Sequence, residues 1–209
     1  RQVVRRQLNL PPEEARALAE RLEAIPGAAD SRYRYHHFLD NCSTRVADEI
    51  DRATKGALSK AGSEASPRSF RDLALRQLRR RTYLYVLVDI LLNGEVDRPI
   101  STWQAAFLPE ELALQVDALK LEGRPLVGLS EELAPASELR DPDQWARPWI
   151  KWYLLFSLPL TLILARRPRF GSFIWSTVAG LLGLVLVLAW AATTNDFLSA
   201  NLNLLILSP

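Results

Sequence analysis

The sequence has no methionine, a single cysteine and only two histidines among its 209 residues. One cysteine excludes an internal disulfide bond. His36, His37 and Cys42 are the three side chains of these types, and they stand too close together to be the spaced ligands of a zinc site. The sequence also has no glycine-rich phosphate loop and no Gly-x-Ser-x-Gly motif. We therefore expect neither a metal nor an organic cofactor.

The lack of methionine leaves the chain without an initiator residue, and its opening residues 1–6 do not resemble a signal peptide. The chain closes on an apolar run at residues 204–207. We expect it to be a piece of a longer protein, with further sequence before Arg1.

A large net charge is also missing, because 26 basic residues oppose 24 acidic ones. The balance is uneven along the chain, since residues 146–209 hold five basic residues and one acidic residue. A nearly neutral front part offers no broad positive surface for a nucleic acid. The charge pattern therefore predicts no nucleic-acid partner.

The front part reads as short strands and helices. Residues 1–10 include two β-forming valines and predict a strand that joins an upstream sheet. Pro11 and the two acids after it start a helix with an apolar side, which Pro26 and Gly27 end. Alternation over residues 32–38 predicts a short extended segment that leads into the next helix.

The middle of the chain is more helical. Residues 55–67 are small and polar and predict a mobile loop. One helix is expected over residues 69–92, basic in its first half and apolar in its second half. The apolar half is too short to cross a membrane, so we expect it to be buried. A helix or helical pair interrupted by a proline is expected over 103–119, and an irregular linker over 120–145.

Two long apolar runs follow, over residues 149–165 and 170–192, and they predict membrane spans. Three arginines within residues 166–169 join them, and the positive-inside rule places this connection in the cytoplasm. The domain at 1–145 and the tail at 194–209 then face outward, leaving 146–209 as the membrane region. The alternative is a buried helical hairpin of a soluble protein.

Cys42 follows Asn41, which is a favourable helix N-cap residue. A thiol in the first turn of a helix faces backbone N–H groups and the positive end of the helix dipole, which favour the nucleophilic thiolate. Cys42 is therefore the candidate nucleophile. The alternative is a small buried cysteine that only packs.

Other candidates surround this residue. His36 and His37 are candidate bases, although an extended chain would hold them away from the thiol; the alternative is a packing or surface role. Tyr35 and Asn41 are candidate substrate contacts, against roles in aromatic packing and helix capping. Arg45 could bind a phosphate or pair with Asp48 or Glu49. Asn201, in the tail, could hold a substrate headgroup or a loop.

The motif around Cys42 resembles a known family. Tyr35, the run Asn41-Cys-Ser-Thr44 and Arg45, together with the stretches at 97–103, 107–109 and 201–205, are similar to the bacterial lipoprotein N-acyltransferases of the Lnb type. The resemblance implies an α+β fold, a circularly permuted papain-like cysteine domain followed by transmembrane helices. It also implies that Cys42 is the nucleophile and that the base is a histidine upstream of it, beyond the start of this chain.

The resemblance further implies an activity and a location. A membrane-anchored acyltransferase would move an acyl chain from a phospholipid, through a thioester on Cys42, to the N-terminal amine of a lipoprotein. The globular part would lie on the periplasmic side of the bacterial inner membrane. Two alternatives stay open: a membrane-bound cysteine peptidase or amidase, and a non-catalytic interaction module in which Cys42 only packs.

Overall fold

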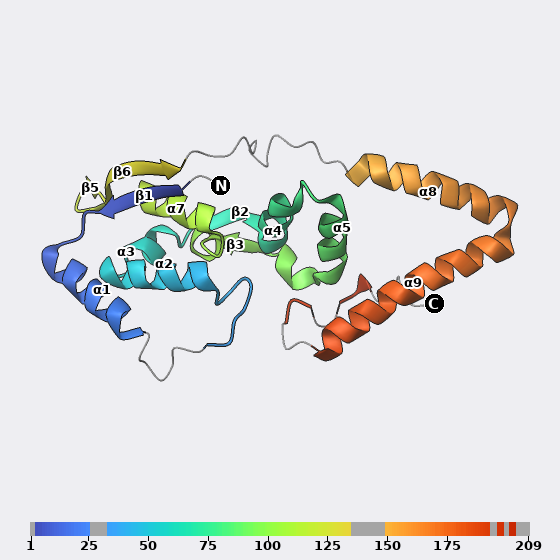
Figure 1. Cartoon of the computed structure of the whole chain (residues 1–209), viewed down its shortest axis with the longest axis horizontal. Helices are drawn as coiled ribbons and strands as arrows, with labels where there is room; N and C mark the ends of the chain where they lie inside the picture. The colour runs from blue at the N-terminus through green and yellow to red at the C-terminus, as the bar shows by residue number, and fades with distance from the viewer. Residues whose placement is uncertain (1–2, 26–32, 135–148, 193–195, 199–200, 204–209) are drawn as a thin grey trace. The chain divides into compact units, whose positions relative to one another are not determined.

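The structure is a computed structural model that describes residues 3–25, 33–134, 149–192, 196–198 and 201–203. The chain divides into two compact units (Figure 1). The first unit comprises residues 1–68 and 99–139, and the second comprises residues 69–98 and 140–209. Each unit is therefore built from two separate stretches of sequence.

The first unit mixes helices with short strands, which confirms the α+β composition. Its helices are α1 (Pro12–Ala24), α2 (Cys42–Ala53), α3 (Ala57–Ala61), α6 (Thr102–Ala105) and α7 (Pro109–Ala118). Its strands are β1 (Val3–Leu8), β2 (Ala65–Ser69), β3 (Pro99–Ser101), β4 (Lys120–Leu121), β5 (Arg124–Pro125) and β6 (Val127–Ala134). The break between α6 and α7 falls just before Pro109, as the sequence predicts.

The strand predicted at the front of the chain is present, but its partner differs from the expectation. β1 pairs antiparallel with β6, with Arg5 opposite Glu131 and Leu8 opposite Val127 (Figure 1). The partner comes from the region expected to be an irregular linker, so residues 127–134 correct that prediction. Pairing with β1 gives hydrogen-bond partners to backbone N–H and C=O groups of β6. The acid-rich sequence of β6 gives no sign of this pairing.

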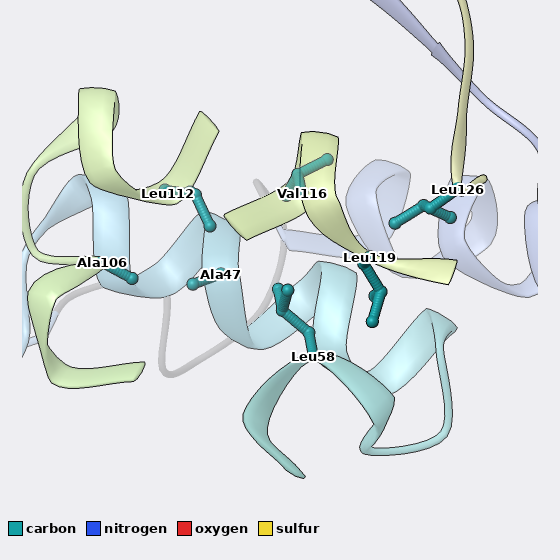
Figure 2. Packing of buried hydrophobic residues seen from close by; sticks show 7 residues of the cluster. All are labelled: Ala47, Leu58, Ala106, Leu112, Val116, Leu119 and Leu126. Atoms are coloured by element: carbon teal, nitrogen blue, oxygen red, sulfur yellow. The ribbon is translucent and has the colours of Figure 1, made fainter. Parts of the chain in front are cut away.

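A small hydrophobic core holds α2 in place. Its buried side chains come from α2, α3 and α7, from the residue after α6 and from the segment after α7 (Figure 2), and they are Ala47, Leu58, Ala106, Leu112, Val116, Leu119 and Leu126. The backbone N–H of Leu126 donates to the carbonyl of Leu119, which closes the turn after α7. Ala47 lies one helical turn beyond the start of α2, so this packing fixes the position of the Cys42 helix.

The loop predicted over residues 55–67 is largely ordered structure, because it holds α3 and the start of β2. Gly62 ends α3, and a Cβ atom at this position would lie 2.8 Å from the backbone nitrogen of Trp103. The nitrogen of Trp103 also donates to the carbonyl of Gly62 at 2.7 Å. The small residues therefore permit close packing here.

The second unit contains five helical segments in its described residues. They are α4 (Phe70–Leu78), α5 (Thr82–Leu91), the 3-10 helix η2 (Gly94–Asp97), α8 (Trp149–Arg166) and α9 (Pro168–Ala192). The single helix expected over 69–92 is therefore two helices, interrupted at Arg79–Arg81. None of the α5 side chains whose burial is described is buried, so the expectation of a buried helix is wrong.

α9 has the length and composition of a membrane span. It has 25 residues, and its most apolar stretch of 18 residues has a mean hydropathy of 2.1 and is only 17% buried. The core helix of a soluble protein would bury most of that surface. Within the described residues α9 is the one helix that meets both criteria, and α8 contributes a shorter apolar segment at Ser157–Arg166. A span at 149–165 and the outward-facing tail stay predictions.

Candidate functional site

Asn41 fixes the start of α2 and saturates its own side chain in doing so. Its Oδ1 accepts the backbone N–H groups of Ser43 at 2.7 Å and Thr44 at 3.0 Å. Thr44 Oγ1 accepts the backbone N–H of Asn41, which completes a capping box. The Nδ2 of Asn41 donates to the carbonyls of His37 and Phe107.

These bonds confirm Asn41 as the N-cap that the sequence predicts. They use both acceptor sites and both donor hydrogens of its amide, so this buried side chain has no group left for a substrate. The structure therefore assigns Asn41 to positioning α2, in place of the predicted substrate contact.

Cys42 is the first residue of α2, and its side chain is exposed. Within the part of the chain that the structure describes, no side chain hydrogen-bonds to its thiol. The Asn41 side chain takes the N–H groups of Ser43 and Thr44, and the Asn41 carbonyl takes that of Arg45. Among the described residues the N–H of Cys42 has no acceptor, which leaves it available beside the thiol. This geometry removes the alternative of a buried, packed cysteine.

Ser43 anchors the same turn from its inner side. It is buried, and its hydroxyl donates to the carbonyl of Ala106 at 2.7 Å. The exposed thiol is thus carried by a helix turn that is hydrogen-bonded to the C-terminal end of α6. A rigidly held nucleophile loses less entropy when it attacks a bound substrate.

The segment before the cap is a tight loop and differs from the predicted extended segment. His36 and Asp40 exchange two backbone hydrogen bonds, at 2.8 and 3.1 Å, and so bridge across the loop. Phe38, at its tip, is buried and packs edge-to-face on Phe107 at 5.2 Å between ring centroids. Because the segment folds back, the histidines lie closer to Cys42 in space than they would in an extended segment.

His36 uses its ring to stabilise that loop. Its Nδ1 accepts the backbone N–H groups of Phe38 at 3.3 Å and Leu39 at 3.1 Å. An acceptor Nδ1 places the proton of the neutral ring on Nε2, which makes Nε2 a donor in this arrangement. A base for Cys42 needs a ring nitrogen whose lone pair faces the thiol. The lone pair of His36 Nδ1 faces the loop N–H groups instead, so this geometry gives His36 a structural role.

His37 and Tyr35 form a small aromatic pair at the surface. Their rings meet edge-on at 5.2 Å between centroids, and both residues are exposed. No hydrogen bond joins the His37 ring to Cys42 among the described residues. A base role for His37 and a substrate contact by Tyr35 stay predictions.

Arg45 pairs with an acid that the sequence reading missed. Its guanidinium makes two hydrogen bonds to the Asp40 carboxylate, at 2.5 and 2.7 Å, and lies 4.3 Å from the centre of the Tyr33 ring. The hydrogen bonds with Asp40 raise the pKa of Arg45. The predicted partners were a phosphate or an acid later in α2. Asp40 precedes the helix, and only the loop geometry brings it to Arg45.

An open groove of about 460 Å³ runs along α1 and α2 beside this pair. Its apolar lining is Leu18, Leu22, Ile25, Tyr33, Val46 and Ile50, and its charged lining is Arg45, Asp48, Glu49 and Arg52. Arg21 on α1 bonds to Glu49 on α2 at 3.0 Å and ties the two helices together. The groove begins one helical turn beyond Cys42.

Asp48 in this groove is expected to destabilise the folded protein at neutral pH. Burial raises its pKa above the ordinary value of 3.8, and the charges of Arg52 and Arg45 only partly oppose this. The folded state therefore binds the proton more tightly than the unfolded chain does. Stability falls as pH rises through the unfolded and then the folded pKa, and the penalty is absent below about 3.8.

Asp48→Asn should thus raise the denaturation midpoint at pH 7, with a smaller gain at pH 3.5. Chemical denaturation of both proteins at the two pH values measures this. Asp117→Asn is the control, because Asp117 carries an ion pair with Arg6 and its loss should not stabilise the protein. A midpoint of Asp48→Asn at pH 7 equal to or below the parent's would contradict the expectation.

Asn201, the remaining candidate, belongs to the second unit and is buried. Its Nδ2 donates to the carbonyls of Ile90 and Leu91, and its Oδ1 accepts the N–H of Asn203. These bonds satisfy the side chain and support the loop role over contact with a substrate headgroup. The described residues contain no group of three or more side chains able to bind a metal ion.

Comparison with known proteins gives a partial match. Residues 1–78 match the family described as the Lnb N-terminal periplasmic domain. This stretch includes Cys42, its capping residues and the groove. No curated protein and no solved structure matches the chain. The permuted papain-like arrangement therefore stays a prediction.

The match supports membership of the Lnb type, which the Cys42 motif had suggested. A periplasmic domain at the front of the chain and the apolar, exposed helix α9 at its back together indicate a membrane-anchored protein. The membrane in which it resides is part of the proposal below.

Proposed function

We propose that this chain belongs to a thiol acyltransferase of the bacterial inner membrane, which transfers an acyl chain from a phospholipid to the N-terminal amine of a lipoprotein. The observation that carries the proposal is the exposed thiol of Cys42 on the first turn of α2, beside its own uncommitted N–H. The match of residues 1–78 to the Lnb N-terminal periplasmic domain supports the family resemblance, and that resemblance implies the substrate classes.

The first half-reaction forms a thioester. A base takes the proton of the Cys42 thiol, the thiolate attacks the carbonyl carbon of a phospholipid ester, and the ester C–O bond breaks. The base then gives the proton to the lysophospholipid oxygen as it leaves. Negative charge collects on the carbonyl oxygen during the attack. The N–H of Cys42 and the positive end of α2 are suited to stabilise it, because both lie at the helix turn that carries the attacking thiol.

The second half-reaction regenerates the enzyme. The lipoprotein amine attacks the thioester carbonyl, the C–S bond breaks, and the amine loses a proton as the thiolate leaves. Asn41 and Ser43 contribute by holding the helix turn in place between the two steps. A membrane anchor suits this chemistry, since donor and acceptor both reside in the bilayer.

Intact mass spectrometry tests the first half-reaction. The protein is reconstituted with a phospholipid that carries isotopic label either in one acyl chain or in the headgroup, and the mass is read before and after hydroxylamine. We expect a mass gain equal to one acyl chain, labelled only by the acyl-labelled lipid and removed by hydroxylamine. The Lnb resemblance implies a histidine base upstream of Arg1, so a form of the chain extended at its N-terminus is measured in parallel.

The competing functions give different results in the same system. A cysteine peptidase or amidase would cleave peptides without lipid and leave no lipid-derived thioester. An interaction module would show neither reaction. The absence of an adduct in both chain lengths, together with unchanged lipid, would overturn the acyltransferase proposal.

A further inference from the structure

Helix α5 has exposed apolar side chains, and the proposed acyl transfer at Cys42 gives them no role. Apart from Thr82 and Asp89, every residue from Thr82 to Leu91 is apolar or aromatic. Tyr83 is 71% exposed and Leu87 is 38% exposed. The other side chains of α5 whose burial is described are half-buried, and none is buried as in a core helix. For an apolar segment of this length, this pattern favours an interfacial helix over a core helix.

The one acid in α5 is neutralised from the side of α4. Asp89 bonds to Arg71 at 2.7 Å, and Arg71 also bonds to Asp97 and to the carbonyls of Leu92 and Asn93. Burial lowers the pKa of Arg71, but its hydrogen bonds with Asp97 and Asp89 outweigh this and leave the pKa raised. The helix therefore presents no uncompensated negative charge to an apolar phase.

The end of α5 is tied to the chain that emerges from α9. The side chains of Asn201 and Asn203 donate to the carbonyls of Ile90 and Leu91, which the helix end leaves unsatisfied. Asn93 bonds to the carbonyls of Asp196 and Phe197.

These bonds limit the distance between α5 and the membrane. Asp196 is four residues beyond Ala192, where α9 ends, so their Cα atoms lie within about 15 Å of each other. The end of α5 is thereby held near the level at which α9 leaves the bilayer.

The other end of α5 is strongly basic. Arg76, Arg79, Arg80 and Arg81 precede it within six positions. Arg80 and Arg81 are exposed. Clustered arginines next to an apolar, tyrosine-containing helix match the headgroup layer of an anionic membrane, where cations meet phosphates and tyrosines meet the interface.

We propose that α5 lies in the interfacial layer of the membrane that α9 crosses, with the Arg76–Arg81 turn bound to anionic phospholipid headgroups. The occupant of this surface is thus the lipid bilayer itself. The proposal goes beyond the acyltransferase function and does not depend on the chemistry of Cys42. In this proposal the second unit binds the membrane surface through α5 and also crosses the membrane through α9.

Depth-dependent quenching tests the location of α5. In a Cys42→Ser background, one exposed leucine at a time is changed to cysteine and labelled with bimane: Leu87 on α5, Leu181 on α9 and Leu114 on α7. All three side chains are substantially exposed in the structure. The proteins are reconstituted in vesicles whose lipids carry a quencher at a shallow or a deep position on the acyl chain.

We expect the Leu87 probe to be quenched best by the shallow quencher, the Leu181 probe by the deep one, and the Leu114 probe by neither. Quenching at Leu87 no greater than at Leu114 would overturn the proposal, because it would mean that protein or water covers α5. Absence of quenching at Leu181 would overturn it as well, because α9 would then lie outside the bilayer.

The charge component has its own test. Arg81→Gln should weaken the docking of α5 on vesicles with anionic lipid by about fivefold, read from Leu87 quenching. Vesicles of zwitterionic lipid alone should show little change. Equal quenching of parent and variant in anionic vesicles would contradict headgroup recognition by this turn.

Discussion

Cys42→Ala is expected to abolish the hydroxylamine-sensitive acyl adduct completely. The thiol is the only cysteine sulfur in the chain, and the proposed thioester has no other atom on which to form. The change removes an exposed sulfur and leaves Asn41, Ser43 and Thr44 with the hydrogen bonds that build the cap. The fold and its stability should therefore stay near those of the parent, and mass spectrometry should show an unmodified protein.

A displaced thiol makes the matched control for this experiment. Ser63 is exposed beyond the end of α3, so the double variant Cys42→Ala, Ser63→Cys retains one accessible cysteine away from any helix N-terminus. We expect this variant to form no adduct, although it should react with a small alkylating reagent. An acyl adduct on the double variant equal to that on the parent would show that exposure alone, without the α2 terminus, accounts for the labelling.

Arg68→Ala is expected to be the most destabilising change in the first unit. Glu111 on α7 is buried, and Arg68 on β2 holds its carboxylate through two hydrogen bonds of 2.8 Å. Removing the guanidinium takes these two charge-assisted hydrogen bonds from a buried carboxylate. We expect a loss of about 3 kcal/mol, at the low end for breaking a buried ion pair because Arg68 is itself partly exposed. Chemical denaturation of the detergent-solubilised chain measures it.

Two further variants separate the buried pair from ion pairs in general. Arg5→Ala breaks the pair with Glu131, whose partners are both largely exposed, and should cost about 0.5 kcal/mol or less. Adding Glu111→Leu to Arg68→Ala should restore much of the lost stability, because an apolar residue carries no buried charge. Similar losses for Arg5→Ala and Arg68→Ala would contradict this account.

The loss of stability in Arg68→Ala should also affect the Cys42 site, because α7 connects the two. Glu111 neighbours Leu112, which packs in the cluster with Ala47 of α2. Loosening α7 therefore weakens the support behind the Cys42 turn.

Local signals in the sequence were sufficient where the structure depends on neighbouring residues. Asn41 is followed within three residues by Thr44, and this spacing alone is enough for the capping box that starts α2. Pro11 and Pro109 likewise start or interrupt helices by backbone geometry that needs no distant partner. The position of Cys42 on the first turn was therefore predictable.

The sequence reading failed where a long-range contact decides the outcome. The linker expected over 120–145 contains β6, because β1 supplies its hydrogen-bonding partner from the other end of the unit. The apolar half of residues 69–92 was expected in a core. Composition shows that α5 is apolar, but only the placement of its neighbours shows that Tyr83 and Leu87 stay exposed and that its other described side chains are half-buried.

By itself, the sequence determined the nucleophile candidate, the helix that carries it and the apolar character of α9, since capping and hydropathy act over a few residues. The tertiary structure alone decided which partner each polar group found. It directed Asn41 to the carbonyl of Phe107, 66 positions away, and Glu111 to Arg68, 43 positions away. Buried polar groups must find partners wherever folding brings them, and pairings at such separations leave no periodic trace in the sequence.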